Sequence, residues 1–381
     1  MDRLIVKNFG PLKDIDIKLN KINLFIGENG SGKSILAKLI SILTSFEFED
    51  IEGFLKKLKS FQIENNLNSK SYIKCYFGKD YIEFKDKTLF FSKEFEILFK
   101  ALKLKEKTVQ ILENTAKIMK DVFKDEANEL KQINKDFQEV LSEKEKVDKL
   151  VSSQYIPAER NLISIFNQSI YSFLTAEIPI PKFLISFFSE FEKARKTIKE
   201  LDFLNVKYKY TDKIEIYYNK NEFLELENSS SGIQSALPLY LTVKYFSQKH
   251  KNIIIEEPEQ NLFPKSQKET IEYIIEQLEE NSLFLMTHSP YVLSALNILM
   301  MAYKAGNLGK EAEDRVLQYC SKKKWINPSE FSAYYLETGK VRDIKGKTGL
   351  ISENEIDNIS DEIQDEFEEL LSIYRKYKNV K

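Results

Sequence analysis

Residues 27–34 read GENGSGKS, and this stretch decides the fold expected for the chain. It fits the pattern G-x-x-x-x-G-K-[ST] of a phosphate-binding loop. Its glycines allow the backbone to curl until successive N–H groups point at phosphate oxygens. Lys33 is expected to reach the β- and γ-phosphates of a nucleotide, and the Ser34 hydroxyl to bind Mg²⁺. The residues expected at this site are Asn29, Gly30, Ser31, Gly32, Lys33 and Ser34.

The segments on either side of the loop support this interpretation. Residues 3–27 alternate apolar and polar side chains around a Gly10-Pro11 turn and end in the apolar run INLFIG, which predicts two strands and a buried third. Residues 33–46, KSILAKLISILTSF, have the apolar spacing of a helix. The loop therefore lies between a strand and a helix N-terminus, whose free N–H groups and dipole attract anions. A glycine-rich turn without a ligand, the alternative, does not require this context.

Two adjacent acids follow a second apolar run, in IIIEEPE at residues 253–259. A carboxylate at the end of a buried strand lies at the sheet edge where α/β proteins bind ligands. We expect Glu256 to hold Mg²⁺ and Glu257 to orient and deprotonate the attacking water. Such a pair alone is often a solvated strand end, and the phosphate loop favours the catalytic role. His288 ends the next apolar run, LFLMTH, and is expected to contact the γ-phosphate or the water.

A second loop of the phosphate-binding type occurs almost 200 residues after the first, in NSSSGIQS at residues 228–235. Ser and Gly at a helix N-terminus supply N–H groups and a dipole for an anion, although they also serve as an ordinary cap. One ATP does not easily use both loops if they lie at opposite ends of a domain. Two chains placed head to tail can enclose two ATP molecules, each contacted by one loop from each chain.

The remaining pattern predicts an α/β fold, with helices on both faces of a sheet that is mostly parallel. Residues 71–92 alternate as a small antiparallel β subdomain. Residues 79–156 contain no Gly or Pro, and within them residues 95–150 have the apolar spacing of helices. That helical insertion forms either one or two amphipathic helices, including a hairpin. The expected divisions are an N-terminal lobe (1–92), the helical insertion (93–205), a C-terminal lobe (206–305), and a hairpin plus acidic helix (306–381).

Composition narrows the class of protein further. The 381 residues are 42% hydrophobic and 30% charged, with a net charge of −2, which argues against a strongly basic nucleic-acid binder but not against a local basic patch. The two cysteines, Cys75 and Cys320, are far apart, so a zinc site or disulfide framework is not expected. The N-terminus lacks a secretory pattern and no apolar run is long enough to span a membrane. We therefore expect a cytoplasmic protein.

In order along the chain, GENGSGKS, a helical insertion, SSSGIQS, IIIEEPEQNLFP and MTHSP resemble the head of an ABC-class ATPase. The resemblance is to the SMC, RecF and OLD group, often described as AAA-family ATPases. It implies an ABC-type P-loop head with a mixed sheet, ATP and Mg²⁺ as ligands, and a homodimer joined through its nucleotide sites. The resemblance makes Glu256 and Glu257 the Walker B pair and His288 the switch histidine. The signature loop acting across the dimer is then Ser231, Gly232 and Gln234.

Three departures from the family pattern stand out. Ile233 replaces the second glycine of the signature, and Glu256 replaces the usual Walker B aspartate. No Q-loop is obvious, and Gln154 in SSQYIPAER is a candidate. The motif YIPAER occurs in stand-alone ATPases of this group, and it suggests that Arg160 reaches a phosphate.

OLD-type nucleases carry a Toprim domain with clustered acids after the ATPase head. No D-x-D pair occurs in residues 289–381, so we expect no nuclease site in this chain. The resemblance implies a switch or sensor that controls a separately encoded nuclease or toxin, as in bacterial anti-phage operons. The alternatives are a RecF-like DNA-repair or DNA-end-binding ATPase, with DNA as a ligand, and a scaffold that hardly hydrolyses ATP.

Overall fold

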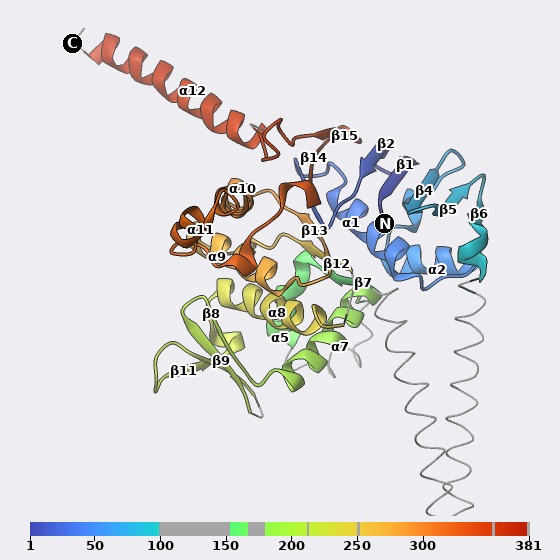
Figure 1. Ribbon diagram of the computed structural model, residues 1–381, viewed down its shortest axis with the longest axis horizontal. Coiled ribbons are helices and arrows are strands. Elements are labelled where there is room, and N and C mark those ends of the chain that lie inside the picture. Colours follow the sequence, from blue (N-terminus) through green and yellow to red (C-terminus); the bar gives the residue numbers. More distant parts are fainter. Residues whose placement is uncertain are drawn as a thin grey trace, which may run out of the picture.

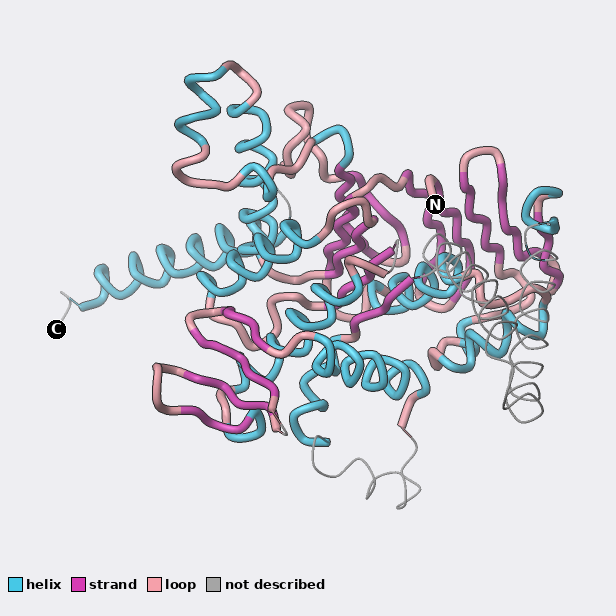
Figure 2. The backbone as a smooth tube through the Cα atoms, turned by 60° about the horizontal axis from the view of Figure 1, so that its bottom comes forward, coloured by secondary structure: helices cyan, strands magenta, loops and turns pink. Residues whose placement is uncertain are grey.

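The computed structural model describes residues 1–97, 99, 153–166, 180–211, 213–249, 252–352 and 355–378. The expected helical hairpin between residues 100 and 152 lies outside these residues. Figure 1 shows one body, with a long helix standing away from it at the C-terminal end. The expected α/β class is confirmed, with a large mixed sheet flanked by helices and an additional antiparallel sheet (Figure 2).

Eleven strands of the described chain form the main sheet, in the order β6-β5-β4-β1-β2-β15-β14-β3-β13-β12-β7. Their bounds are β1 (Arg3–Phe9), β2 (Leu12–Lys18), β3 (Ile22–Gly27), β4 (Tyr72–Phe77), β5 (Asp80–Lys85), β6 (Thr88–Phe91), β7 (Ser153–Ile156), β12 (Asn252–Glu256), β13 (Ser282–Met286), β14 (Phe331–Glu337) and β15 (Lys340–Asp343). Helices flank the sheet, except for α12, which projects from the body. The described α-helices are α1 (Lys33–Ser45), α2 (Ile51–Ser60), α5 (Leu162–Phe166), α7 (Lys182–Thr197), α8 (Ser231–Phe246), α9 (Pro264–Gln277), α10 (Pro290–Gly306), α11 (Lys310–Val316) and α12 (Glu355–Lys378).

The parallel part of the sheet runs β14-β3-β13-β12-β7 and forms the centre of the core. Every residue of β3 and β12 is buried, as expected for parallel strands covered on both faces. Helix α1 packs against β7, β12 and β13. Because these strands are parallel, their carboxyl ends meet at one edge of the sheet, and the loops after them are brought together there.

Sequence patterns predicted the antiparallel part well. β1 and β2 pair across the Gly10-Pro11 turn, and β4, β5 and β6 form the expected meander beside β1. β14 and β15 form the expected hairpin at Thr338 and Gly339, where both residues have positive φ. The sequence did not indicate that β14 continues the central sheet as a parallel partner of β3.

A second sheet of four strands has the order β11-β10-β9-β8, with β8 (Glu200–Phe203), β9 (Val206–Tyr210), β10 (Ile214–Tyr217) and β11 (Phe223–Glu225). This sheet corrects the prediction of a helical insertion that extends to residue 205. Helix α7 ends at Thr197, and Leu201 and Phe203 of β8 alternate into the core opposite β9. The interval 93–205, expected to be helical, therefore contributes the strands β7 and β8 as well.

None of the described helices is both long enough and apolar enough to cross a membrane.

Candidate functional site

Three of the sequence-predicted elements lie together at the carboxyl edge of the parallel strands. The GENGSGKS loop follows β3, Glu256 and Glu257 stand at the end of β12, and His288 follows β13, which lies between β3 and β12. The strand order thus explains how residues more than 200 positions apart in the sequence reach one site.

The phosphate loop is shaped by close backbone contacts. Gly27 has a φ of 151°, and a Cβ there would lie 2.3 Å from the carbonyl oxygen of Leu336 on β14, so only glycine fits. Residues 28–30 are exposed at the tip of the loop. Lys33 Nζ folds back and donates to the carbonyls of Gly27 and Glu28, at 2.6 and 2.8 Å. Its ammonium is therefore held inside the curl of the loop.

Burial lowers the pKa of Lys33 to about 8, against the opposing attraction of nearby carboxylates, of which Glu257 contributes most. Because the Lys33 ammonium is only partly solvated, an anionic partner nearby stabilises its charged form. Protonation of Lys33 in the free protein is consequently incomplete just above neutral pH.

Glu256 is buried and accepts hydrogen bonds from two hydroxyl groups. Tyr155 donates at 2.8 Å from the neighbouring strand β7, and Ser34 donates from the start of α1. Burial raises the pKa of Glu256, whereas the two hydroxyl donors lower it. Tyr155 is a site residue that the sequence analysis missed. The sequence could have indicated this role only if the four residues SQYI had been recognised as a strand that pairs in parallel with β12.

Oxygen ligands suit Mg²⁺, which in proteins takes one or two side chains and completes its shell with phosphate oxygens and water. The Ser34 hydroxyl and the Glu256 carboxylate already touch each other, so both ligands converge on one point. Within the described residues, no group of three or more His, Cys, Asp or Glu side chains could hold a metal ion. The pair therefore fits a metal shared with a bound nucleotide.

Glu257 has an unusual backbone and a partly exposed carboxylate. Its φ is +45°, a left-handed conformation that costs energy in a residue other than glycine. Its N–H donates to the carbonyl of Met286 at 2.8 Å, and its Oε1 lies 3.6 Å from Nε2 of His288. The His288 imidazole is the largest cause of a lowered pKa at Glu257, against the effect of burial. The carboxylate is thus ionised at neutral pH.

Glu259 is a second residue that the sequence analysis did not single out. Its Oε1 accepts from the Thr287 hydroxyl at 2.7 Å and from the backbone N–H of His288 at 2.9 Å. These bonds fix the loop after β13 to the turn after β12. Glu259 is accordingly a positioning residue for His288, and the acid at the fourth place of EEPE was its signal in the sequence.

Arg160 requires a correction. It is fully buried, and its guanidinium donates to four backbone carbonyls rather than facing the phosphate loop. The acceptors belong to Pro157, Ser235, Glu256 and Glu257, at distances between 2.5 and 3.2 Å. Burial lowers the pKa of Arg160 to about 10, which leaves the group charged at neutral pH. It therefore ties the end of β12 to the first turns of α8 and supports the strained Glu257.

The second loop forms the start of α8, where Ser230 is the N-cap and makes no side-chain capping bond. Ser231 is exposed, and Gly232 packs closely on Asn261, whose carbonyl would lie 3.0 Å from a Cβ. Ile233, which replaces the second glycine of the family signature, is buried. Its side chain therefore does not cover the exposed start of α8 at Ser231. In the described chain, no hydrogen bond joins Ser230, Ser231 or Gly232 to the phosphate loop.

The side chains of Gln234 and Gln154 both bond to nearby backbone. The Gln234 amide donates to the carbonyls of Glu227 and Ser229, at 3.0 and 2.9 Å, so it shapes its own loop. Gln154 is buried within β7 and donates to the carbonyl of Tyr155. Because successive strand residues point to opposite faces, Gln154 does not share the Glu256 side with Tyr155.

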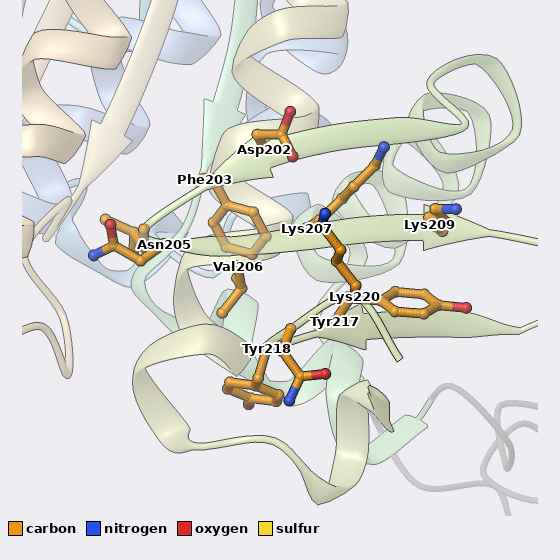
Figure 3. A pocket seen from close by; sticks show the side chains of 11 residues that line it. Asp202, Phe203, Asn205, Val206, Lys207, Lys209, Tyr217, Tyr218 and Lys220 are labelled. Atoms are coloured by element: carbon orange, nitrogen blue, oxygen red, sulfur yellow. The ribbon is translucent and has the colours of Figure 1, made fainter. Parts of the chain in front are cut away.

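An open hollow lies on the second sheet, away from all of these residues (Figure 3). Lys207, Lys209 and Lys220 line it together with Tyr217. Glu200 pairs with Lys207 at 2.6 Å and Lys209 at 3.8 Å, which neutralises part of its positive charge. No residue predicted from the sequence to bind nucleotide lines this hollow.

A family model described as an AAA ATPase domain matches residues 1–178 and 177–293, more than half of the chain. The chain has no significant match among curated protein sequences.

Among solved structures, the chain is similar to an Smc head bound to the C-winged helix domain of ScpA, at 12% identity and a TM-score of 0.45, covering 90% of this chain and 97% of that chain. The SMC head domain from Thermotoga maritima is similar at 11% identity and a TM-score of 0.42, with 90% and 97% covered. An Smc head with an extended coiled coil, bound to the C-terminal domain of ScpA from Pyrococcus furiosus, is similar at 12% identity and a TM-score of 0.39. The match covers 95% of this chain and 99% of that chain. No functional conclusion follows from likenesses at these TM-scores.

Proposed function

This chain belongs to the AAA ATPase domain family, and on that premise we propose that it hydrolyses ATP in a head-to-tail dimer that controls a separately encoded effector protein. The observation that carries the proposal is the meeting of the phosphate loop, Glu256, and the Glu257–His288 pair at one sheet edge.

In the proposed reaction, the phosphate loop binds the β- and γ-phosphates through its backbone N–H groups, and Lys33 exchanges its two carbonyl partners for phosphate oxygens. Ser34 and Glu256 would hold Mg²⁺, which would neutralise part of the phosphate charge when bound. Tyr155 keeps Glu256 oriented through its hydrogen bond. These residues bind and orient the substrate.

Glu257 acts as the general base. Its lowered pKa keeps it ionised, so it can accept a hydrogen bond from the attacking water and then the proton. His288 holds the carboxylate from one side, and Arg160 holds the backbone carbonyl of the same residue from the other. Glu259 in turn positions His288. The base is therefore held directly by His288 and Arg160, and indirectly by Glu259, before ATP arrives.

The start of α8 completes the site of a second chain. Ser231 is exposed at an uncapped helix N-terminus, which suits an anion from outside the chain. Gly232 packs on Asn261 and Leu262, and the next residue, Phe263, is 75% exposed although it is large and apolar, as expected of a surface that a partner covers. These features support a head-to-tail dimer in which ATP is enclosed between a phosphate loop and a signature loop.

The effector and any role in anti-phage defence rest on the family resemblance of the motif order. We propose that the closed dimer switches a nuclease or toxin encoded elsewhere, and that this chain cuts no nucleic acid itself. The runner-up is a DNA-end-binding ATPase. Cleavage of plasmid DNA by the purified chain would contradict the first proposal. Affinity for duplex DNA that falls steeply with salt would favour the second.

The dimer itself is tested by sedimentation with Glu257→Gln, which retains ATP but loses the base. We expect Mg-ATP to convert this variant into a stable dimer. The matched control, Glu257→Gln with Lys33→Ala, should not respond to ATP. A Glu257→Gln variant that hydrolyses ATP at the parental rate would contradict the assignment of the base.

A further inference from the structure

Helix α12 carries an apolar stripe that the rest of the described chain leaves in solvent. The helix projects from the body after the β14–β15 hairpin (Figure 1). Ile363, Phe367, Leu370, Ile373 and Tyr374 are 48–63% exposed, and every described side chain from 363 to 376 except Leu371 is classed as exposed. Several large apolar side chains in solvent on one projecting helix indicate an interaction surface.

The spacing of the stripe indicates what kind of surface it is. Ile363, Phe367, Leu370 and Tyr374 follow one another at intervals of four, three and four residues. Intervals of this kind place side chains in one row along a helix, as in the seam between two packed helices. A partner helix is therefore the shape that fits this row.

The charges of α12 are separated along its length. Residues 355–369 contain eight Asp or Glu and no Lys or Arg, whereas residues 370–378 contain Arg375, Lys376 and Lys378 and no acid. This order also suits the dipole of a single helix, which favours acids at its start and bases at its end. The dipole, however, gives no reason for an exposed apolar row beside the charges.

We propose that α12 pairs in the antiparallel direction with α12 of a second copy of this chain. If the pair is centred between Phe367 and Leu370, these two residues face each other across the seam and Ile363 faces Tyr374. Arg375 and Lys378 then reach the acidic half of the partner helix, at the level of residues 362 and 359. A parallel pair would instead bring the two acidic halves together, which is unfavourable.

This contact needs no nucleotide, because α12 contains none of the residues of the ATP site. The pairing of α12 therefore goes beyond the proposed function. The α12 dimer and the ATP-driven dimer can each fail without the other. Two helices of this length bury a small interface, so we expect a dimer that dissociates in the micromolar range.

The test measures association by sedimentation velocity without nucleotide, in a Lys33→Ala background that removes ATP-driven pairing. We expect a dimer whose dissociation constant rises by roughly 100-fold in Phe367→Glu. Ser372→Glu, on the opposite side of the helix, is the matched control and should leave association unchanged. Far-UV circular dichroism of each variant shows whether helix is retained. A chain that stays monomeric at about 100 μM, well above the range expected for this interface, would overturn the proposal, as would a dimer that survives Phe367→Glu.

Direction is tested by reversing charges. Arg375→Glu with Lys378→Glu should weaken the dimer roughly tenfold, because acids then face acids. Adding Asp357→Lys and Asp361→Lys to the same chain should restore much of the lost affinity, because these lysines lie within two residues of positions 359 and 362, which the acids introduced at 378 and 375 face. A parallel pair keeps like charges together in every variant. Failure of the second pair of substitutions to restore affinity would therefore contradict the antiparallel arrangement.

Discussion

Two loops of this protein have the composition of a phosphate site, and they differ in what surrounds them. The phosphate loop at 27–34 has a buried lysine and a hydroxyl bonded to a buried carboxylate, with the Glu257 carboxylate nearby. The signature loop, here residues 230–232, has an exposed, uncapped helix end, and within the described residues no cation or carboxylate bonds to it. The difference is what our proposal requires, in which the first loop is half of a catalytic site and the second serves another chain.

The largest effect on ATP binding is expected from a substitution in the phosphate loop. Lys33→Ala removes the only side-chain cation of the loop, so ATP affinity should fall by about 100-fold or more and turnover should be undetectable. Equilibrium binding of a fluorescent ATP analogue measures the change. Binding within threefold of the parent would show that the loop does not hold the phosphates.

At the second loop, Ser231→Arg should separate binding from turnover. The residue is exposed and outside the first site, so ATP affinity should stay within about twofold while turnover falls about 100-fold, since the arginine blocks the partner's phosphate. Steady-state kinetics and binding are measured on the same sample. Loss of binding together with turnover would refute the assignment of this loop to a second chain.

Arg160 ties the end of β12 to the first turns of α8, close to the residues that follow the signature loop, and its variants sharpen the comparison. Arg160→Lys keeps the charge but not the four carbonyl contacts, so we expect kcat to fall about tenfold with little change in KM, because Glu257 loses its support. Arg160→Met leaves the carbonyls unpaired and should lower the free energy of unfolding by about 3 kcal/mol, measured in urea. Unchanged kcat in Arg160→Lys would mean that the clamp does not position the base.

The smallest effect expected is the change of ATP affinity with pH. Lys33 in the free protein has a pKa of about 8, below its ordinary value, and ATP binds the charged form. Affinity should therefore be constant below pH 8 and fall as pH rises through it, by about tenfold at pH 9, because binding must then take up a proton. Titration with a non-hydrolysable analogue measures this. Lys33→Arg, which does not titrate there, should show a flat profile, and a flat profile for the parent would contradict the assignment.

Local sequence predicted the parts of the site that depend on local pattern. The strand–loop–helix around Lys33 and the strands before Glu256 and His288 are uninterrupted apolar runs, and each lies where it was expected. Family membership confirms the ATPase class. The roles of the individual residues stay predictions.

Other parts depend on contacts that no local pattern encodes. Tyr155 reaches Glu256 only because a four-residue strand pairs with β12, about 100 residues further along the chain. A buried arginine is rare. The YIPAER resemblance suggested a phosphate contact for Arg160, whereas its four carbonyl partners come from three separate segments of the chain. β14 joins β3 from the other end of the chain, and it supplies the carbonyl that restricts position 27 to glycine.

The central claim is that each ATP site is built from two chains, and mixing two inactive variants tests it most directly. Lys33→Ala and Ser231→Arg chains combined in equal amounts should regain about a quarter of the parental ATPase rate. Half of randomly formed dimers are mixed, and each mixed dimer has one intact site of two. Ser231→Arg mixed with a chain carrying both substitutions has no intact site and should stay inactive. A Lys33→Ala and Ser231→Arg mixture that is no more active than the separate variants would contradict the account.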